Sequence, residues 1–262
     1  MIGLCVTNLL PAATASGGSW LAGAALTNLA SRDIGETARS SDALAASTRF
    51  ILDHGSAVSR RVLVLRAHNL SSAAQIRWSV GTSSGGNEVT TTGTIDAWRY
   101  TPRRYDGRDR EVIVVLPTAA TGRYDYVEIF DTTNASGYVD IGQAWLGPVD
   151  FTPTYNASYG LKNRLIDTGG KERSPEGGLW TAQQRVISGV SFVLDALSLD
   201  DGDALHELER YVGTTEQMVY LQSLTDAAEM QRYGFIGTFD EMSDLDYPFY
   251  RGRSMALRGT QD

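Results

Sequence analysis

The residues best suited to chemistry in this chain lie between Trp98 and Arg110. Within Arg99–Arg110, five arginines stand against two aspartates, with two tyrosines and a proline among them. Guanidinium groups bind carboxylates and phosphates through parallel hydrogen bonds, and arginine and aromatic residues are frequent at protein interfaces. We therefore predict a surface interaction site made of Trp98, Arg99, Tyr100, Arg103, Arg104, Tyr105, Arg108 and Arg110.

The arginine-rich segment has three interpretations. It is a loop braced by its own carboxylates Asp106, Asp109 and Glu111, a contact with a second subunit or another protein, or a nucleic acid contact. The last is the least favoured, because the net charge is -8 and the sequence pI about 4.9. Nucleic-acid-binding proteins usually carry a basic field. We expect a protein partner and no nucleic acid.

The three histidines give no catalytic signal. His54, His68 and His206 are far apart in the sequence and lack the spacing of a metal site or a catalytic triad. We expect His68 to hydrogen-bond backbone near Asn69, and His206 to lie on the flank of a helix.

Two acidic runs are interpreted structurally. Asp200, Asp201 and Asp203 surround Gly202 as in part of a calcium loop, but the bidentate glutamate of such a loop is absent, so we expect these residues to cap a helix. The run Glu241, Asp244 and Asp246 is interpreted as a solvated loop. Paired carboxylates can hydrolyse glycosides, yet this is the least favoured function. We predict no enzymatic activity, no cofactor and no metal.

Composition indicates a folded protein with a sizeable core. The 262 residues are 42% hydrophobic, which is enough for two modest domains. The single cysteine, Cys5, excludes an internal disulfide and is expected to be a small buried residue of the first strand. No apolar run reaches 18 residues, and Met1–Val6 lacks the basic residues of a secretory signal, so we expect no membrane insertion.

The first 150 residues read mainly as short strands separated by turns. Alternating apolar and polar residues, with Gly, Ser, Asn and Asp clusters between them, predict strands at Arg49–Leu52, Arg61–Ala67, Ala74–Val80, Glu111–Leu116, Tyr124–Phe130 and Tyr138–Trp145. Such a pattern is typical of a sandwich or jelly roll. Trp145 is expected in the core, whereas Trp98 is the better candidate for the surface.

The second half mixes strands with one helix. Asp167–Gly178 predicts the loop of a hairpin between Leu161–Ile166 and Leu179–Val186, and a long apolar strand follows at Val186–Leu199. Further strands are expected at Met218–Leu221, Gly234–Phe239 and Tyr247–Leu257.

The helix is predicted over Ala204–Val212. Leu205, Leu208 and Val212 fall on one helical face, and Gly213 can end the helix. Glu207 and Glu209 are expected to face solvent.

Several apolar patterns together resemble the tail-tip and baseplate structural proteins of long-tailed bacteriophages, in particular the distal-tail type. The resemblance covers nearly the whole chain and is carried by Val6–Thr14, Ala25–Leu29, Arg61–Ser71, Ile76–Val80, Tyr124–Phe130, Tyr138–Pro148, Asp150–Gly160, Arg185–Phe192 and Met230–Ile236.

The resemblance implies a mainly β protein of two domains. Residues 1–150 would form a jelly-roll, galactose-binding-like domain, and residues 151–262 a small barrel-like α+β domain with a hairpin and a single helix. The implied function is that of a virion structural protein, assembled in the host cytoplasm as a ring of identical copies that contacts other tail proteins. The alternative is a carbohydrate-binding module that recognises host surface polysaccharide.

Overall fold

The computed structural model describes residues 1–101, 110–156, 160–182, 184, 186–242 and 253–261. Its chain divides into two compact units. The jelly-roll unit comprises Thr7–Asp150 and Ser223–Gly234, and the helix-and-sheet unit comprises Met1–Val6, Phe151–Gln222 and Phe235–Asp262. The first six residues therefore belong to the same unit as the C-terminal part of the chain.

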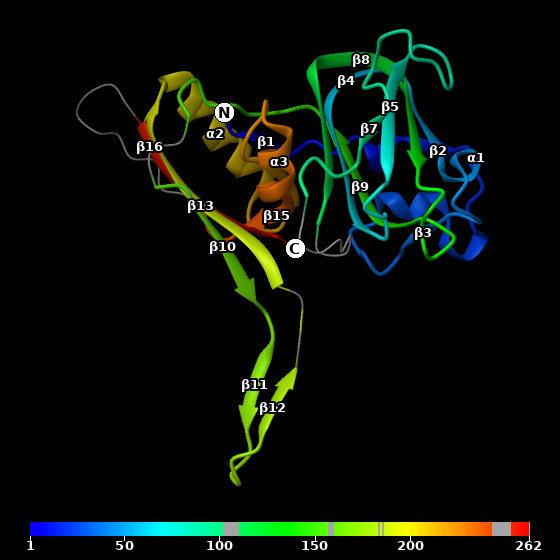
Figure 1. The fold of residues 1–262 in the computed structure, drawn as a ribbon. Helices are drawn as coiled ribbons and strands as arrows, with labels where there is room; N and C mark the ends of the chain where they lie inside the picture. Colours follow the sequence, from blue (N-terminus) through cyan, green and yellow to red (C-terminus); the bar gives the residue numbers. More distant parts are fainter. Residues whose placement is uncertain (102–109, 157–159, 183, 185, 243–252, 262) are drawn as a thin grey trace. The chain divides into compact units, whose positions relative to one another are not determined.

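The jelly-roll unit consists of strands with a few short helices (Figure 1). Its strands are β2 (Thr14–Ser16), β3 (Ala38–Arg39), β4 (Phe50–His68), β5 (Gln75–Gly81), β6 (Thr90–Thr91), β7 (Ile95–Asp96), β8 (Val112–Phe130) and β9 (Asp140–Gly147). Its helices are α1 (Ala45–Thr48), α3 (Ala227–Tyr233) and the 3-10 turns η1 (Leu10–Ala12), η2 (Ala22–Ala24) and η3 (Leu26–Ala30).

Two 19-residue strands, β4 and β8, build both layers of the sandwich. In one layer, Phe50–Asp53 of β4 pairs with Tyr124–Val127 of β8; β2 pairs with this stretch of β4, and β5 with this stretch of β8. In the other layer, Val62–Leu65 of β4 pairs with Val112–Val115 of β8 on one side and with β9 on the other. The register shifts between these two stretches. The sequence patterns had predicted two separate strands in each case, which is wrong because the strands bend without ending.

The bends have local causes. In β4, Gly55 adopts a left-handed φ of 71°, and its N–H bonds to Asp53 Oδ1 at 2.8 Å. In β8, Pro117 falls between the paired residues Val115 and Ala120, where a residue without an N–H costs no ladder hydrogen bond. Both features are those of β-bulges, which bend and twist a strand.

The core of the jelly-roll unit lies between the two layers. It includes Leu52, Leu65, Trp78, Val127 and Ile141, each fully shielded from solvent. Trp145 is 3% exposed, so its predicted place in the interior is confirmed. The mainly β, sandwich-type fold predicted from the turn spacing is confirmed as well.

The helix-and-sheet unit is built on a six-stranded antiparallel sheet in the order β1-β14-β15-β16-β13-β10. Its elements are β1 (Gly3–Cys5), β10 (Lys162–Asp167), β11 (Gly170–Arg173), β12 (Leu179–Ala182), β13 (Val186–Leu197), α2 (Leu199–Val212), β14 (Met218–Leu221), β15 (Phe235–Phe239) and β16 (Arg253–Gln261). Cys5 lies buried on β1, as predicted.

Helix α2 begins five residues earlier than predicted. Ser198 caps it by accepting a hydrogen bond from the Asp201 N–H at 3.0 Å, while Asp200 and Asp201 occupy the first turn. A serine thus serves as the cap, and the aspartates complement the helix dipole. Leu205, Leu208 and Val212 are buried as predicted.

The predicted exposure of Glu209 is wrong, since this residue is 3% exposed. It lies four residues after Leu205 and therefore on the packed face.

Two further differences concern the end of the chain. Helix α3 was not predicted, because seven residues are too few for a clear apolar period. Its start nevertheless carries a signal, since Asp226 accepts hydrogen bonds from the N–H groups of Ala228 and Glu229. The last strand is Arg253–Gln261, four residues beyond the predicted end at Leu257, and Tyr247–Gly252 lies outside the described residues.

Candidate functional site

The predicted interaction site is described in part. Trp98, Arg99, Tyr100 and Arg110 are placed by the structure, whereas Arg103, Arg104, Tyr105 and Arg108 lie outside the described residues.

Trp98 does not belong to a surface, contrary to the prediction. It is 7% exposed, its Nε1–H donates to the Ser71 carbonyl at 2.8 Å, and its ring meets that of His68 edge-on, with centroids 5.7 Å apart. A buried indole with its N–H satisfied is a stable arrangement. His68 Nδ1 accepts from the Leu70 N–H at 3.3 Å, which confirms its predicted bond to backbone.

Gln231 of α3 fixes the segment that follows Trp98. Its side chain is 1% exposed, with Oε1 accepting from the Arg99 N–H at 2.5 Å and Nε2 donating to the Ala97 carbonyl at 2.6 Å. These two bonds attach α3 to Ala97–Arg99, although about 130 residues of sequence separate them. No pattern in the sequence indicated this contact.

Through this attachment, Arg232 joins the predicted site. The guanidinium carbon of Arg232 lies 5.1 Å from the centre of the Tyr100 ring, and that of Arg110 lies 5.8 Å from it, both within cation–π range. Burial raises the pKa of the Tyr100 hydroxyl, while the two arginines oppose this effect. We call Tyr100, Arg110 and Arg232 the arginine patch.

Neither guanidinium group of the arginine patch forms an ion pair with a carboxylate among the described residues, and Glu111, whose charge acts on Tyr100, pairs with Arg66 at 3.9 Å. Among the described residues, the arginines that form ion pairs are Arg39, Arg60, Arg66, Arg77, Arg123 and Arg164. The patch therefore concentrates positive charge on a chain whose net charge is -8.

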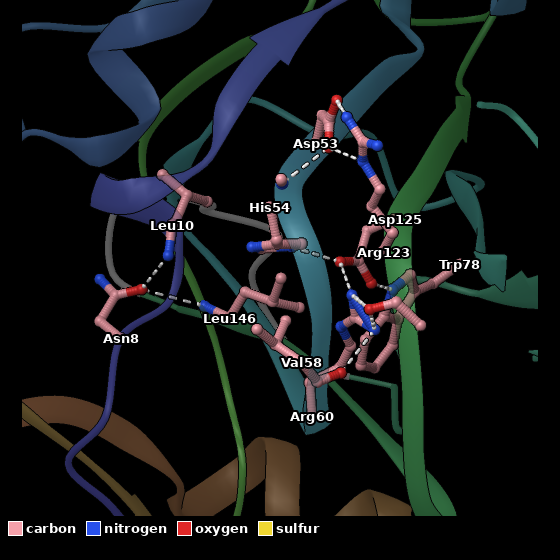
Figure 2. Close-up of polar contacts among 12 residues, drawn as sticks. Asn8, Leu10, Asp53, His54, Val58, Arg60, Trp78, Arg123, Asp125 and Leu146 are labelled. Atoms are coloured by element: carbon pink, nitrogen blue, oxygen red, sulfur yellow. Dashed lines mark hydrogen bonds and ion pairs between the residues drawn. The ribbon is translucent and has the colours of Figure 1, made fainter. Parts of the chain in front are cut away.

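A buried polar network joins β4, β5 and β8 (Figure 2). Both oxygens of Asp125, a fully buried residue, are occupied: Oδ1 accepts from Trp78 Nε1–H at 2.8 Å, while Oδ2 lies 2.7 Å from His54 Nε2 and 3.1 Å from Arg60 Nη2. Arg60 also donates to the carbonyls of Val58 and Gly122.

The Asp125 network holds the bent part of β4 against its neighbours. Burial lowers the pKa of Arg60, and the charge of Asp125 opposes this effect. A carboxylate with donors on both oxygens suits a structural cross-link. The partner of the His54 ring is Asp125, at 2.7 Å from Nε2, and no hydroxyl or thiol of the described residues bonds to it.

A half-exposed ion pair adjoins this network. Arg123 donates to both carboxylate oxygens of Asp53, at 2.7 and 2.8 Å (Figure 2). These bonds, together with the Gly55 N–H, lower the pKa of Asp53 to about 2.

The outward side of β8 carries three aromatic residues, each in contact with an arginine. Tyr124, Tyr126 and Phe130 alternate with the buried Asp125, Val127 and Ile129 and are partly exposed. Arg123 stacks on Tyr124 at 5.0 Å, Arg49 donates to the Tyr126 hydroxyl at 3.4 Å, and Arg77 lies 5.5 Å from the Phe130 ring centre. We call Tyr124, Tyr126 and Phe130 the β8 aromatic row.

The helix-and-sheet unit carries a two-stranded ribbon made of β11 and β12 (Figure 1). Every residue of these two strands is exposed, and they pair only with each other among the described residues. Large apolar side chains on the ribbon and at its base are open to solvent, with exposures of 77% for Leu165, 56% for Leu179, 74% for Trp180 and 45% for Val186. We call residues 162–182, 184 and 186–188 the arm.

The remaining candidates have ordinary environments. His206 is exposed on α2, and Asp240 pairs with Arg164 at 2.5 Å. Glu241 is exposed, whereas Asp244 and Asp246 lie outside the described residues. The described residues contain no group of three or more His, Cys, Asp or Glu side chains placed to hold a metal ion. No helix within those residues is long and apolar enough to cross a membrane.

Comparisons with known proteins give limited similarity. No protein-family model and no curated protein sequence matches the chain. Similar solved structures include the family 32 carbohydrate-binding module of NanJ from Clostridium perfringens in complex with galactose, at 10% identity and a TM-score of 0.40 over 56% of this chain and 98% of that one.

Two other solved structures cover a similar share of this chain. The lectin domain of lectinolysin with Lewis b antigen has 14% identity and a TM-score of 0.38, over 54% of this chain and 96% of that one. A chitosan-binding module from Paenibacillus sp. IK-5 with chitotriose has 20% identity and a TM-score of 0.36, over 53% and 99%. With TM-scores below 0.5, these similarities assign no function to the chain.

Proposed function

We propose that this chain is a non-catalytic assembly protein that docks with neighbouring protein subunits through its arm. The observation that carries the proposal is the exposure of Leu179 and Trp180 on a ribbon with no covering element among the described residues, and of Leu165 and Val186 at its base. An isolated two-stranded hairpin is only marginally stable in water, and exposed apolar surface commonly marks a protein interface. A partner that covers the arm would stabilise the hairpin and bury these side chains.

Both faces of the arm present an apolar residue to such a partner. Trp180 is paired with Glu172 and Leu179 with Arg173, so the two apolar side chains point to opposite faces. Leu165 and Val186 share one face at the base, since Leu165 pairs with Ser188 and Val186 with Asp167. A partner that contacts both faces of the ribbon fits this arrangement better than one that covers a single face.

The assembly that we propose is the tail tip of a long-tailed bacteriophage, with this chain as a structural component of the virion. The sequence resemblance supports this setting, and the arm supports the mode of contact. Quantitative mass spectrometry of purified tailed particles tests it: we expect several copies of the chain per particle. Its absence from tails that are complete by electron microscopy would refute the setting.

The arm itself is tested on the purified chain. Trp180→Ala should weaken the concentration-dependent association seen by sedimentation velocity, whereas Thr181→Ala, an exposed change on the neighbouring position of β12, should not. In hydroxyl-radical footprinting, Trp180 should become protected as association proceeds. Equal association of both variants and the parent chain would show that the arm is not the contact.

A second function, recognition of carbohydrate by the jelly-roll unit, is favoured by the β8 aromatic row. Sugar sites combine aromatic faces with a few fixed polar groups. Here Tyr124 and Tyr126 follow one another on the outward side of β8, and Phe130 comes after Glu128. Arg49, Arg77 and Arg123 supply planar hydrogen-bond donors beside the three rings. This site lies in a different unit from the arm, so the same chain can perform both functions.

A glycan array tests the sugar function, with galactose, Lewis b antigen and chitotriose among its probes. Tyr126→Ala should remove any binding detected. Tyr138→Ala is the matched control, because Tyr138 is also a half-buried tyrosine with an arginine, Arg39, 4.2 Å from its ring centre, but it is not on β8. Binding that Tyr126→Ala leaves intact, or no binding at all, would exclude the β8 aromatic row as a sugar site.

A further inference from the structure

We propose that the arginine patch binds the acidic outer face of helix α2 on a second copy of this chain. The inference deepens the proposed assembly function and rests on it, but it concerns a surface separate from the arm. Arg110 and Arg232 converge on the Tyr100 ring, and no described carboxylate forms an ion pair with either guanidinium group.

The arginine patch is held in place before any partner arrives. Gln231 bonds to the backbone of Ala97 and Arg99, and Trp98 between them is anchored on the Ser71 carbonyl. Arg232 directly follows Gln231, and Tyr100 directly follows Arg99. Because these neighbours are hydrogen-bonded, the backbone that carries Tyr100 and Arg232 loses little conformational freedom on binding, which favours affinity.

Helix α2 carries charges that complement the patch. Asp200, Asp203 and Glu207 are exposed and spaced three and four residues apart, so they form one stripe along the helix. The opposite face, with Leu205, Leu208 and Val212, packs into the core of its unit. Tyr211, at 75% exposure, and Leu199, at 62%, stand at either end of the helix and offer apolar contacts beside the stripe.

The contact would join two different surfaces of identical chains. The patch belongs to the jelly-roll unit and the stripe to the helix-and-sheet unit, so each copy offers one of each. Head-to-tail contacts of this kind produce a closed ring when the rotation between copies closes, and a filament when it does not. Arginine and tyrosine are also the residue types most often found at the energetic centre of interfaces.

Charge reversal tests the proposal on the full chain. Arg110→Glu with Arg232→Glu should abolish this association in sedimentation velocity, and so should Asp203→Arg with Glu207→Arg. An equimolar mixture of the two double variants should associate again, since each reversed surface then meets a complementary one. The control is Arg32→Glu with Arg61→Glu, two arginines of the jelly-roll unit that belong to neither the arginine patch nor the proposed sugar site, which should associate like the parent chain.

The outcomes separate this inference from the proposed function. Recovery in the mixture supports the patch-to-stripe contact and also shows that both variants fold. Association unchanged by either reversal, while Trp180→Ala weakens it, would overturn the contact and leave the arm in place. Two variants that lose association alone and fail to recover when mixed would also overturn the contact. A parent chain that stays monomeric at its highest soluble concentration would overturn both.

Discussion

Replacing Asp125 with alanine should destabilise the jelly-roll unit far more than replacing a carboxylate on its surface. The substitution removes three contacts at once, from Trp78 Nε1, His54 Nε2 and Arg60. It leaves Arg60, which is fully buried, without the charge that balances it. Removing one partner of a buried ion pair costs about 3–5 kcal/mol, and we expect Asp125→Ala to fall in this range.

The assay is urea denaturation followed by tryptophan fluorescence. Four of the five tryptophans, Trp20, Trp78, Trp98 and Trp145, belong to the jelly-roll unit, so the signal reports mainly on this unit. Asp53→Ala is the matched control, since Asp53 pairs with Arg123 at the surface, where ion pairs contribute little. The double change Arg60→Met with Asp125→Leu should regain much of the lost stability, because an apolar pair leaves no buried charge.

The reasoning would be refuted if Asp125→Ala lowered the free energy of unfolding by no more than Asp53→Ala does. The network would then be solvated in solution. A double variant less stable than Asp125→Ala would instead show that Arg60 contributes through its bonds to the Val58 and Gly122 carbonyls and not through its charge.

Three other predictions follow from the geometry. Leu208→Ala should cost about 2–5 kcal/mol in chemical denaturation, as expected for an emptied core site, whereas Glu207→Ala should cost under about 0.5 kcal/mol; equal losses would mean that α2 packs through another face. The pKa of Asp53, about 2, should rise toward the ordinary aspartate value of about 3.9 in Arg123→Ala when followed by NMR titration. Because the folded-state pKa is the lower one, the stability contributed by this pair should be complete above that ordinary value and lost as the pH falls through about 2; an unshifted Asp53 in the variant would exclude Arg123 as the cause. Gln231→Ala should detach α3 and increase amide hydrogen exchange at Arg99, while Glu229→Ala, a change in the first turn of the same helix, should not; equal exchange in both would show that α3 is held by other contacts.

Much of the fold could be predicted from local patterns because the turns and the apolar alternation are local. The strands near Ala74–Val80 and Tyr138–Trp145 and the packed face of α2 follow directly from residue spacing. What could not be predicted depends on distant pairing. The continuity of β4 and β8 through Gly55 and Pro117 requires both layers to be present, because a bulge and a turn use the same residues.

The candidate site shows the same division. The enrichment of arginine and tyrosine after Trp98 marked a region of which the structure places Tyr100 close to Arg232. Burial of Trp98 depends on Ser71 and His68, which the sequence does not link to it. Arg232 itself is an ordinary residue of a short helix until Gln231 attaches that helix to Ala97 and Arg99. Contacts over more than a hundred residues leave no periodic trace in a single sequence.

The way in which the two units are arranged along the sequence also sets the order in which they can fold during synthesis. Strand β1 pairs with β14, through Gly3 with Leu221 and Cys5 with Val219, so more than 200 residues must leave the ribosome before Ile2, Leu4 and Cys5 find their partner. The jelly-roll unit is translated within this interval, apart from α3. An early-made apolar strand that waits for a late-made one is open to wrong pairing meanwhile. The helix-and-sheet unit therefore stays incomplete throughout this interval, and β16 joins β13 to β15 only after both of those strands have been made.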